Sequence, residues 1–160
     1  MKRIFFRRRR EGKTDYKSRR NLLMSGKPRI VIRVSNKYIT AQIVESKEAQ
    51  DFIISGVNSK ELSEFGWKGS FKNTPASYLT GIMIGKKATE KGISEMIFDI
   101  GMQRTTKGSK IYACLKGIID AGISMNHGKE MIPGEERILG KHINEKLSED
   151  IKKIKEKILK

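Results

Sequence analysis

Residues Arg29 to Val44 read RIVIRVSNKYITAQIV, a run of β-branched side chains interrupted by three polar residues. This pattern predicts a β-hairpin with strands at Arg29–Val34 and Tyr38–Val44 and a turn at Ser35-Asn36-Lys37. The next apolar run, Asp51–Val57, predicts a third strand. Three such strands in succession favour an antiparallel meander.

The chain after this meander predicts helices and one further strand. Asn73-Thr74-Pro75 is typical of a helix start, and Gly92 of its end, with Leu79, Ile82 and Met83 on one face.

The apolar run Ser94–Ile100 predicts a strand that is buried on both faces. A second helix follows from Ser109 to about Ala121, with apolar residues at helical spacing at Ile111, Leu115, Ile118 and Ile119.

The C-terminal part carries an apolar stripe with spacings of three and four residues. This spacing predicts one long amphipathic helix that begins at Leu139 and docks on the domain or on a neighbouring protein. Its stripe consists of Leu139, Ile143, Leu147, Ile151, Ile154 and Ile158.

These elements predict a single α/β domain with a mixed sheet covered by helices. With 160 residues, of which 37% are hydrophobic, the chain is long enough for one domain with a core. We expect a basic arm at residues 1–28, an α/β domain at 29–134 and the amphipathic helix at 135–160. The boundary of the arm is placed at Asn21–Pro28, which contains a Gly and a Pro.

The first twenty residues of the arm carry half of the net charge of +16, with ten Lys or Arg and two acids. Alone in water such a run is expected to be disordered or a frayed helix, and a polyanion would order it. Arginine suits phosphate and can stack on bases, and an aromatic in a basic run can do the same, which favours RNA. A solubility tail or a localisation signal is the alternative. The candidate RNA-binding residues of the arm are Arg7, Arg8, Arg9, Arg10, Lys13, Thr14, Tyr16, Lys17, Arg19 and Arg20.

Further candidate contacts lie outside the arm. Arg33, Asn36 and Lys37 extend the basic surface at one end of the hairpin. A loop directly before the second helix contributes Arg104, Thr105, Thr106, Lys107 and Lys110, where free amides at the helix N-terminus favour a phosphate. The alternative is that this loop is an ordinary polar connection without a binding role. His127, in a Gly-rich loop, either donates to a phosphate or braces its loop.

Composition and spacing argue against a membrane protein and against an enzyme. No apolar run reaches the length of a membrane span, and the single Cys114 indicates a reducing cytosol. Gly81–Lys87 (GIMIGKK) only approaches a phosphate-binding loop, and Asp99 is the only carboxylate in the core of the later strand. His127 and His142 lack the spacing of a metal site. We therefore expect no catalysis, no cofactor, no metal and no small-molecule substrate.

The stretch FRRRREGKTDYKSRRNLL, from Phe6, resembles the start of the large-subunit ribosomal proteins that bind 5S rRNA. This family is numbered eighteen in bacteria and five in eukaryotes, and the sequence of this stretch most resembles its archaeal and eukaryotic branch. The resemblance continues through Arg29–Ile43, Tyr78–Gly85, Arg104–His127 and Lys141–Ile143. Long terminal extensions of the eukaryotic members have no counterpart here, so their contacts are not carried over.

The resemblance implies a ribonuclease H-like arrangement of the domain and a structural role in the cytoplasmic ribosome. The implied partners are 5S rRNA, the large-subunit rRNA and neighbouring large-subunit ribosomal proteins in the central protuberance. Two alternatives remain, a general basic RNA-binding protein outside the ribosome and a metal-dependent nuclease. The first should bind many RNAs about equally, and the second needs divalent metal for activity.

Overall fold

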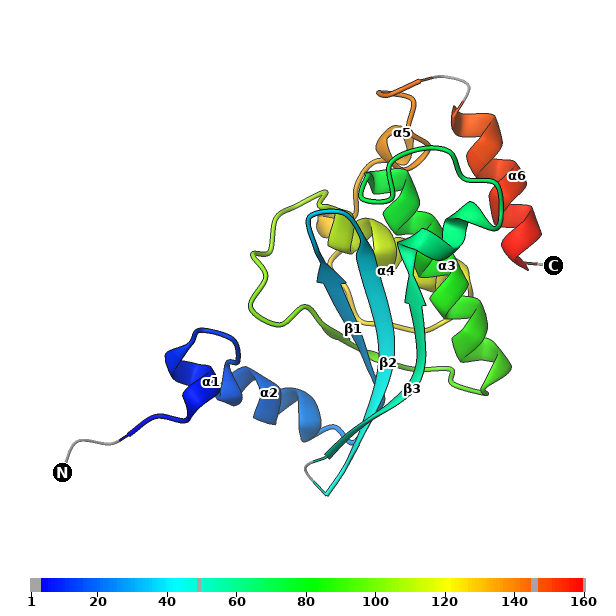
Figure 1. The fold of residues 1–160 in the computed structure, drawn as a ribbon. Coiled ribbons are helices and arrows are strands. Elements are labelled where there is room, and N and C mark those ends of the chain that lie inside the picture. The colour runs from blue at the N-terminus through cyan, green and yellow to red at the C-terminus, as the bar shows by residue number, and fades with distance from the viewer. Residues whose placement is uncertain (1–3, 49, 145–146, 160) are drawn as a thin grey trace.

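The computed structural model describes residues 4–48, 50–144 and 147–159 and shows one α/β domain with a projecting arm (Figure 1). Its mixed sheet has four strands in the order β3-β2-β1-β4. The strands are β1 (Arg29–Val34), β2 (Ile39–Lys47), β3 (Gln50–Asn58) and β4 (Ile97–Asp99). Helices cover one face of the sheet. The predicted α/β class with a mixed sheet is thus confirmed.

The hairpin and the meander form as predicted. Strand β1 pairs antiparallel with β2, with Ile30 opposite Ile43, and β2 pairs antiparallel with β3. The side chains of Ile30, Ile32 and Ile43 are fully buried because they point to the helix-covered face. Successive side chains of a strand point to opposite faces of the sheet, so the residues that alternate with these isoleucines lie on the other, open face.

The fourth strand is shorter than predicted and lies at the sheet edge. Only Ile97–Asp99 pairs, parallel with β1, and Ile97 and Phe98 are half-buried rather than enclosed on both sides. The strand ends where the Asp99 carboxylate accepts a hydrogen bond from the amide of Gly101, whose φ is 63°. A side chain that closes its own turn in this way stops the ladder.

Helix α3 (Thr74–Glu90) forms the centre of the core, against the sheet, α4 (Lys110–Asp120) and α6 (Leu147–Leu159). Its N-cap is Asn73, as predicted, whose Oδ1 accepts from the amide of Ala76 at 2.8 Å. The sequence predicted that one apolar face of this helix would be buried, but the helix is buried around most of its circumference. This follows from its place between layers, which sequence spacing does not reveal.

The prediction of one long C-terminal helix is wrong. The chain forms a short α5 (Glu135–Ile138) and turns at Gly140 with φ 67°, and the separate helix α6 spans Leu147–Leu159. Ile143 lies in the turn and is 51% exposed. Within α6 the predicted stripe holds, because Ile151, Ile154 and Ile158 are buried in the core.

The arm contains two short helices, α1 (Arg7–Arg10) and α2 (Tyr16–Leu23), neither of which has a buried residue. Asp15 caps α2 by accepting from the amides of Lys17 and Ser18 and from the Ser18 hydroxyl. The Ser18 hydrogen bonds, from side chain and backbone, hold the pKa of Asp15 below its ordinary value. Helix α2 thus extends into the segment that the sequence assigns to the boundary.

Candidate nucleic-acid interface

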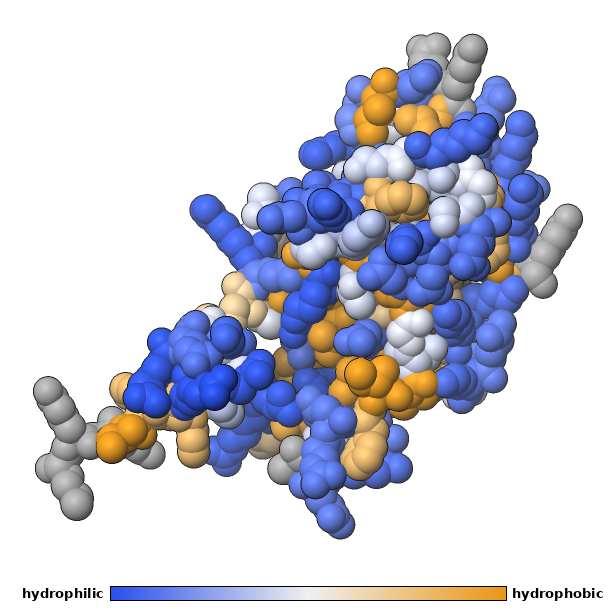
Figure 2. Space-filling model, in the orientation of Figure 1, coloured by the Kyte–Doolittle hydropathy of each residue, from blue (hydrophilic) through white to orange (hydrophobic). Residues whose placement is uncertain are grey.

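The arm concentrates exposed cations, and Figure 2 shows its hydrophilic surface at the lower left. Arg7 and Lys13 both pair with Glu11, at 2.9 and 2.8 Å, and Arg8 Nε donates to Thr14 Oγ1 at 2.8 Å. These contacts fold the arm back on itself between α1 and α2. Within the described ranges, no ion pair or side-chain hydrogen bond is made by Arg10, Lys17 and Arg20. Their donors are therefore directed to solvent.

Aromatic rings lie among these cations. The ring of Tyr16 is 36% exposed and lies 5.3 Å from the ring of Phe6 between centroids. The guanidinium carbon of Arg9 lies 4.3 Å from the ring centroid of Phe5. Sequence reasoning missed Phe5 and Phe6, although exposed aromatics directly beside an arginine run are a readable signal. Rings with one exposed face can stack on unpaired bases.

An open pocket of about 630 Å³ follows one face of α2. Its lining residues on the helix recur three and four positions apart, so they share that face. Arginines line it together with apolar surface from Leu23, Met24 and the Tyr16 ring. The pocket is lined by Arg8, Thr14, Tyr16, Arg19, Arg20, Leu23 and Met24. A lining that combines apolar surface with cations suits a base with its phosphate.

A second cleft, of about 540 Å³, separates the arm from the edge of the sheet. Arg8, Lys13 and Arg19 line it from the arm, and Arg33 and Met102 line it from the domain. Figure 1 shows the loop after β4, in yellow-green, on the side of the sheet from which the arm projects. The arm and the predicted loop contacts thus face a common region.

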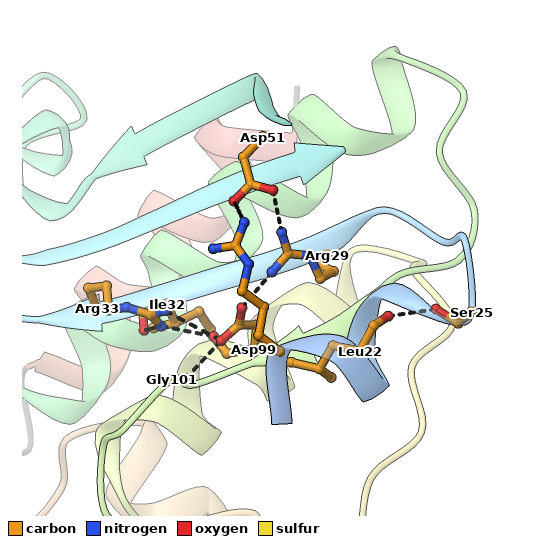
Figure 3. A network of polar contacts seen from close by, with 9 residues as sticks. Leu22, Ser25, Arg29, Ile32, Arg33, Asp51, Asp99 and Gly101 are labelled. Atoms are coloured by element: carbon orange, nitrogen blue, oxygen red, sulfur yellow. Dashed lines mark hydrogen bonds and ion pairs between the residues drawn. The ribbon is translucent and has the colours of Figure 1, made fainter. Parts of the chain in front are cut away.

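Charged side chains connect the arm to this edge through the buried Arg29 (Figure 3). Arg19 Nη2 lies 2.8 Å from Asp51 Oδ2, and Asp51 Oδ1 lies 2.9 Å from Arg29 Nη2. Arg29 Nη1 in turn lies 2.9 Å from Asp99 Oδ2, and Asp99 also pairs with Arg33. The sequence did not predict the ion pairs of Arg29, Asp51 and Asp99, because the residues that pair lie far apart in the chain.

The predicted hairpin residues are placed as follows. Asn36 and Lys37 are exposed in the β1–β2 turn. Arg33 is also exposed, but its guanidinium is fixed by donating to the carbonyls of Ile32 and Asp99 at 2.9 and 3.0 Å. The guanidinium of Arg33 is therefore fixed in position, and Asp99 partly neutralises its charge. Lys37, in contrast, extends into solvent.

The predicted loop before α4 is exposed from Arg104 to Lys107, with Lys107 paired to Glu130 at 2.8 Å. Ser109 occupies the N-cap position without a side-chain capping bond. Partial burial, and then the nearby Lys72, lower the pKa of Lys110. The positive charge of Lys72 thus acts on Lys110 at the start of α4. Lys72 was not among the predicted contacts.

His127 braces its own loop. Its Nδ1 lies 2.9 Å from the carbonyl oxygen of Met125, which only accepts, so Nδ1 carries the proton. The residue is exposed, and its Nε2 has no hydrogen-bond partner among the described residues. This geometry favours the bracing role and leaves one nitrogen for a ligand.

Residues that resemble catalytic or metal-binding motifs have structural explanations. Gly81 lies inside α3, where its lack of a side chain admits the backbone of Cys114. Burial raises the pKa of Cys114 to about 12, so the thiol is a packing group. Across residues 4–48, 50–144 and 147–159, no three His, Cys, Asp or Glu side chains gather as metal ligands. Over the same ranges, no helix has the length and apolarity to cross a bilayer.

An exposed cationic arm beside an α/β domain, without a cluster of catalytic acids in the described chain, is the arrangement of a protein that binds a polyanion. The model of the family "Ribosomal large subunit proteins 60S L5, and 50S L18" matches residues 2–95 and 86–128. The chain therefore belongs to this family of large-subunit ribosomal proteins. Its role is structural rather than enzymatic, as a component of the cytoplasmic ribosome.

Several archaeal relatives are similar over most of the chain. The large ribosomal subunit protein uL18 of Caldivirga maquilingensis is 48% identical over 88% of this chain and 68% of its own length. The uL18 proteins of Aeropyrum pernix and Korarchaeum cryptofilum are 46% and 49% identical, over 88% and 92% of this chain and 66% and 77% of their own lengths. The chain thus spans about two-thirds of the first two relatives.

Proposed function

We propose that this protein binds 5S rRNA and anchors it to the large-subunit rRNA in the central protuberance. The observation that carries the proposal is the arm: residues 1–20 hold half of the net charge of the chain, its two helices have no buried residue, and aromatic rings lie among its arginines. Phosphate contacts of Arg10, Lys17 and Arg20 would supply affinity, because these cations have no protein partner in the described ranges.

The remaining candidate residues would extend this interface along the domain. In our proposal, the exposed Lys37 and the Arg104–Lys107 loop bind phosphates next to those held by the arm. Residues 29–134 would form the body of the 5S rRNA interface, and the outer face of α6 would contact neighbouring ribosomal proteins. Tyr16 would stack on an unpaired base, which is how proteins read single-stranded RNA.

Competition binding is the test of this function. Labelled 5S rRNA is bound to the full chain and displaced by unlabelled 5S rRNA or by a transfer RNA, a structured RNA that carries the same kind of backbone charge. We expect transfer RNA to compete at least a hundredfold less well. Equal competition by both would support a general RNA-binding protein and contradict the proposal. The competition test does not depend on divalent-metal catalysis. Cleavage of the RNA during the test would support the alternative of a metal-dependent nuclease.

A further inference from the structure

Five charged side chains of alternating sign form a continuous chain from the arm across the sheet to its β4 edge (Figure 3). The arm and β1 supply the cations, and β3 and β4 supply the acids. The nitrogen–oxygen distances along this charge chain are 2.8, 2.9, 2.9 and 3.4 Å. In order, its members are Arg19, Asp51, Arg29, Asp99 and Arg33.

Arg29 is the buried centre of the charge chain. It is only 2% exposed, and its two terminal nitrogens each pair with a different carboxylate. A buried guanidinium holds its partners strictly, because losing either one leaves a desolvated charge without compensation. Asp51 and Asp99 are therefore fixed in place by Arg29 rather than free to follow a ligand.

Each acid also holds a group of the candidate interface. Asp51 holds Arg19, and within the described ranges no other hydrogen bond or ion pair joins residues 4–23 to the sheet. Asp99 holds Arg33 and accepts from the amide of Gly101, where the loop towards Arg104 begins. The charge chain thus connects both parts of the candidate interface to one rigid centre.

We propose that Asp51 and Asp99 are positioning residues, which set the spacing between the cations of the arm and those of the sheet edge and the following loop. The inference rests on the proposed RNA-binding function and deepens it. Phosphate contacts alone give affinity for any polyanion, whereas cations held at fixed spacing match the shape of one folded RNA. Two acids inside a basic interface thereby produce selectivity for 5S rRNA.

The sign of the effect distinguishes this role from simple electrostatics. Replacing Asp51 by Asn raises the net charge by one, so electrostatics alone would strengthen binding to every RNA. A positioning role requires the opposite for 5S rRNA. The control is Glu130→Gln, which removes an exposed acid that pairs with Lys107 of the loop and lies outside the charge chain.

The experiment measures dissociation constants of the full chain for 5S rRNA and for a plain RNA duplex of similar length. For Asp51→Asn we expect affinity for 5S rRNA to fall about tenfold, the equivalent of one charged hydrogen bond, with duplex affinity unchanged or raised. For Glu130→Gln we expect both affinities to stay within about twofold or to rise. Stronger 5S rRNA binding by Asp51→Asn would overturn the proposal.

A second pair of variants leaves the buried Arg29 contacts intact, in case Asp51→Asn does not fold. Arg19→Gln and Arg20→Gln each remove one cation from α2. Of these two arginines, Arg19 is the one that pairs with Asp51. We expect Arg20→Gln to weaken both RNAs by the same few-fold factor, and Arg19→Gln to lower the 5S-to-duplex ratio about tenfold. Equal ratios in the two variants would also overturn the positioning role. If the wild-type protein shows no 5S preference, the proposed function itself fails.

Discussion

Gly117 of α4 lies directly against the carbonyl oxygen of Tyr78 in α3, so a Cβ at this glycine would overlap the backbone of the neighbouring helix. Gly81 makes the reciprocal approach to the backbone of Cys114. The two helices cross at these glycines, and this crossing brings α3 close enough to bury nearly all of its surface. Glycines that appear in the sequence as helix weaknesses are therefore packing requirements.

We expect Gly117→Ala to lower the free energy of unfolding by about 2 kcal/mol or to prevent folding. Overpacking typically costs about 1–3 kcal/mol, while the better helix propensity of Ala returns at most about 1 kcal/mol. Urea denaturation followed by circular dichroism measures the change. Glu90→Ala, an exposed change on α3, is the control and should have almost no effect. A Gly117→Ala protein as stable as wild type would show that the helices are farther apart than described.

Tyr78 connects three helices through its hydroxyl group. The hydroxyl donates to Asp120 Oδ2 at 2.7 Å and accepts from Lys155 Nζ of α6 at 3.0 Å. Burial, and then the hydrogen bond and charge of Asp120, raise the pKa of Tyr78 far above its ordinary value. The neutral phenol is therefore the form that stabilises the fold.

We expect Tyr78→Phe to cost about 1 kcal/mol of unfolding free energy at neutral pH, because Asp120 and Lys155 lose a buried partner. The folded-state pKa is raised, so this stabilisation is fully present below the unfolded pKa near 10 and is lost as the pH rises towards the folded value. Thermal melts between pH 8 and pH 11 check this. The wild type should lose stability more steeply than Tyr78→Phe, and parallel curves would contradict the assignment.

Local sequence signals predicted those elements whose stabilising contacts are local. The hairpin at Arg29–Val44 and the cap at Asn73 depend on neighbouring residues, and both were read correctly. The break at Gly140 was missed because the apolar spacing continues through it, although Ile143 points to solvent. Periodicity alone does not show where a chain must turn to reach its docking site.

The candidate site shows the same division. A run of arginines with a Tyr is visible in the sequence, so the cations of the arm could be named in advance. The pairing of Arg29 with Asp99 joins residues 70 positions apart. Only the parallel addition of β4 beside β1 brings them together. The groups that hold the interface in place therefore required the fold.

RNA binding should depend strongly on salt. About six phosphate contacts, each releasing about 0.7 counterions from single-stranded segments, predict a slope near −4 in a plot of log affinity against log salt concentration. Fluorescence anisotropy with labelled 5S rRNA between about 50 and 300 mM KCl measures this slope. A slope shallower than about −1 would contradict binding through the arm.

Deleting residues 1–20 should leave a folded protein that no longer binds 5S rRNA selectively. Helices α1 and α2 have no buried residue, so little apolar area is lost, and removing ten Lys or Arg relieves charge repulsion. Arg29 keeps both of its carboxylate partners after the deletion, because Asp51 and Asp99 belong to the domain. The thermal midpoint should therefore change little.

Binding should be lost because the deletion removes the unpaired arm cations and the Tyr16 ring together. Charge-assisted hydrogen bonds to phosphate contribute roughly 1–3 kcal/mol each, and several are removed at once. Within the intact arm, replacing Arg7–Arg10 by Ala should weaken all RNAs, whereas Tyr16→Ala should lower the preference for 5S rRNA. If the truncated protein kept nanomolar, 5S-selective binding with an unchanged salt slope, recognition would have to lie in the sheet edge and the Arg104–Lys110 loop, because these are the cationic surfaces that the deletion leaves.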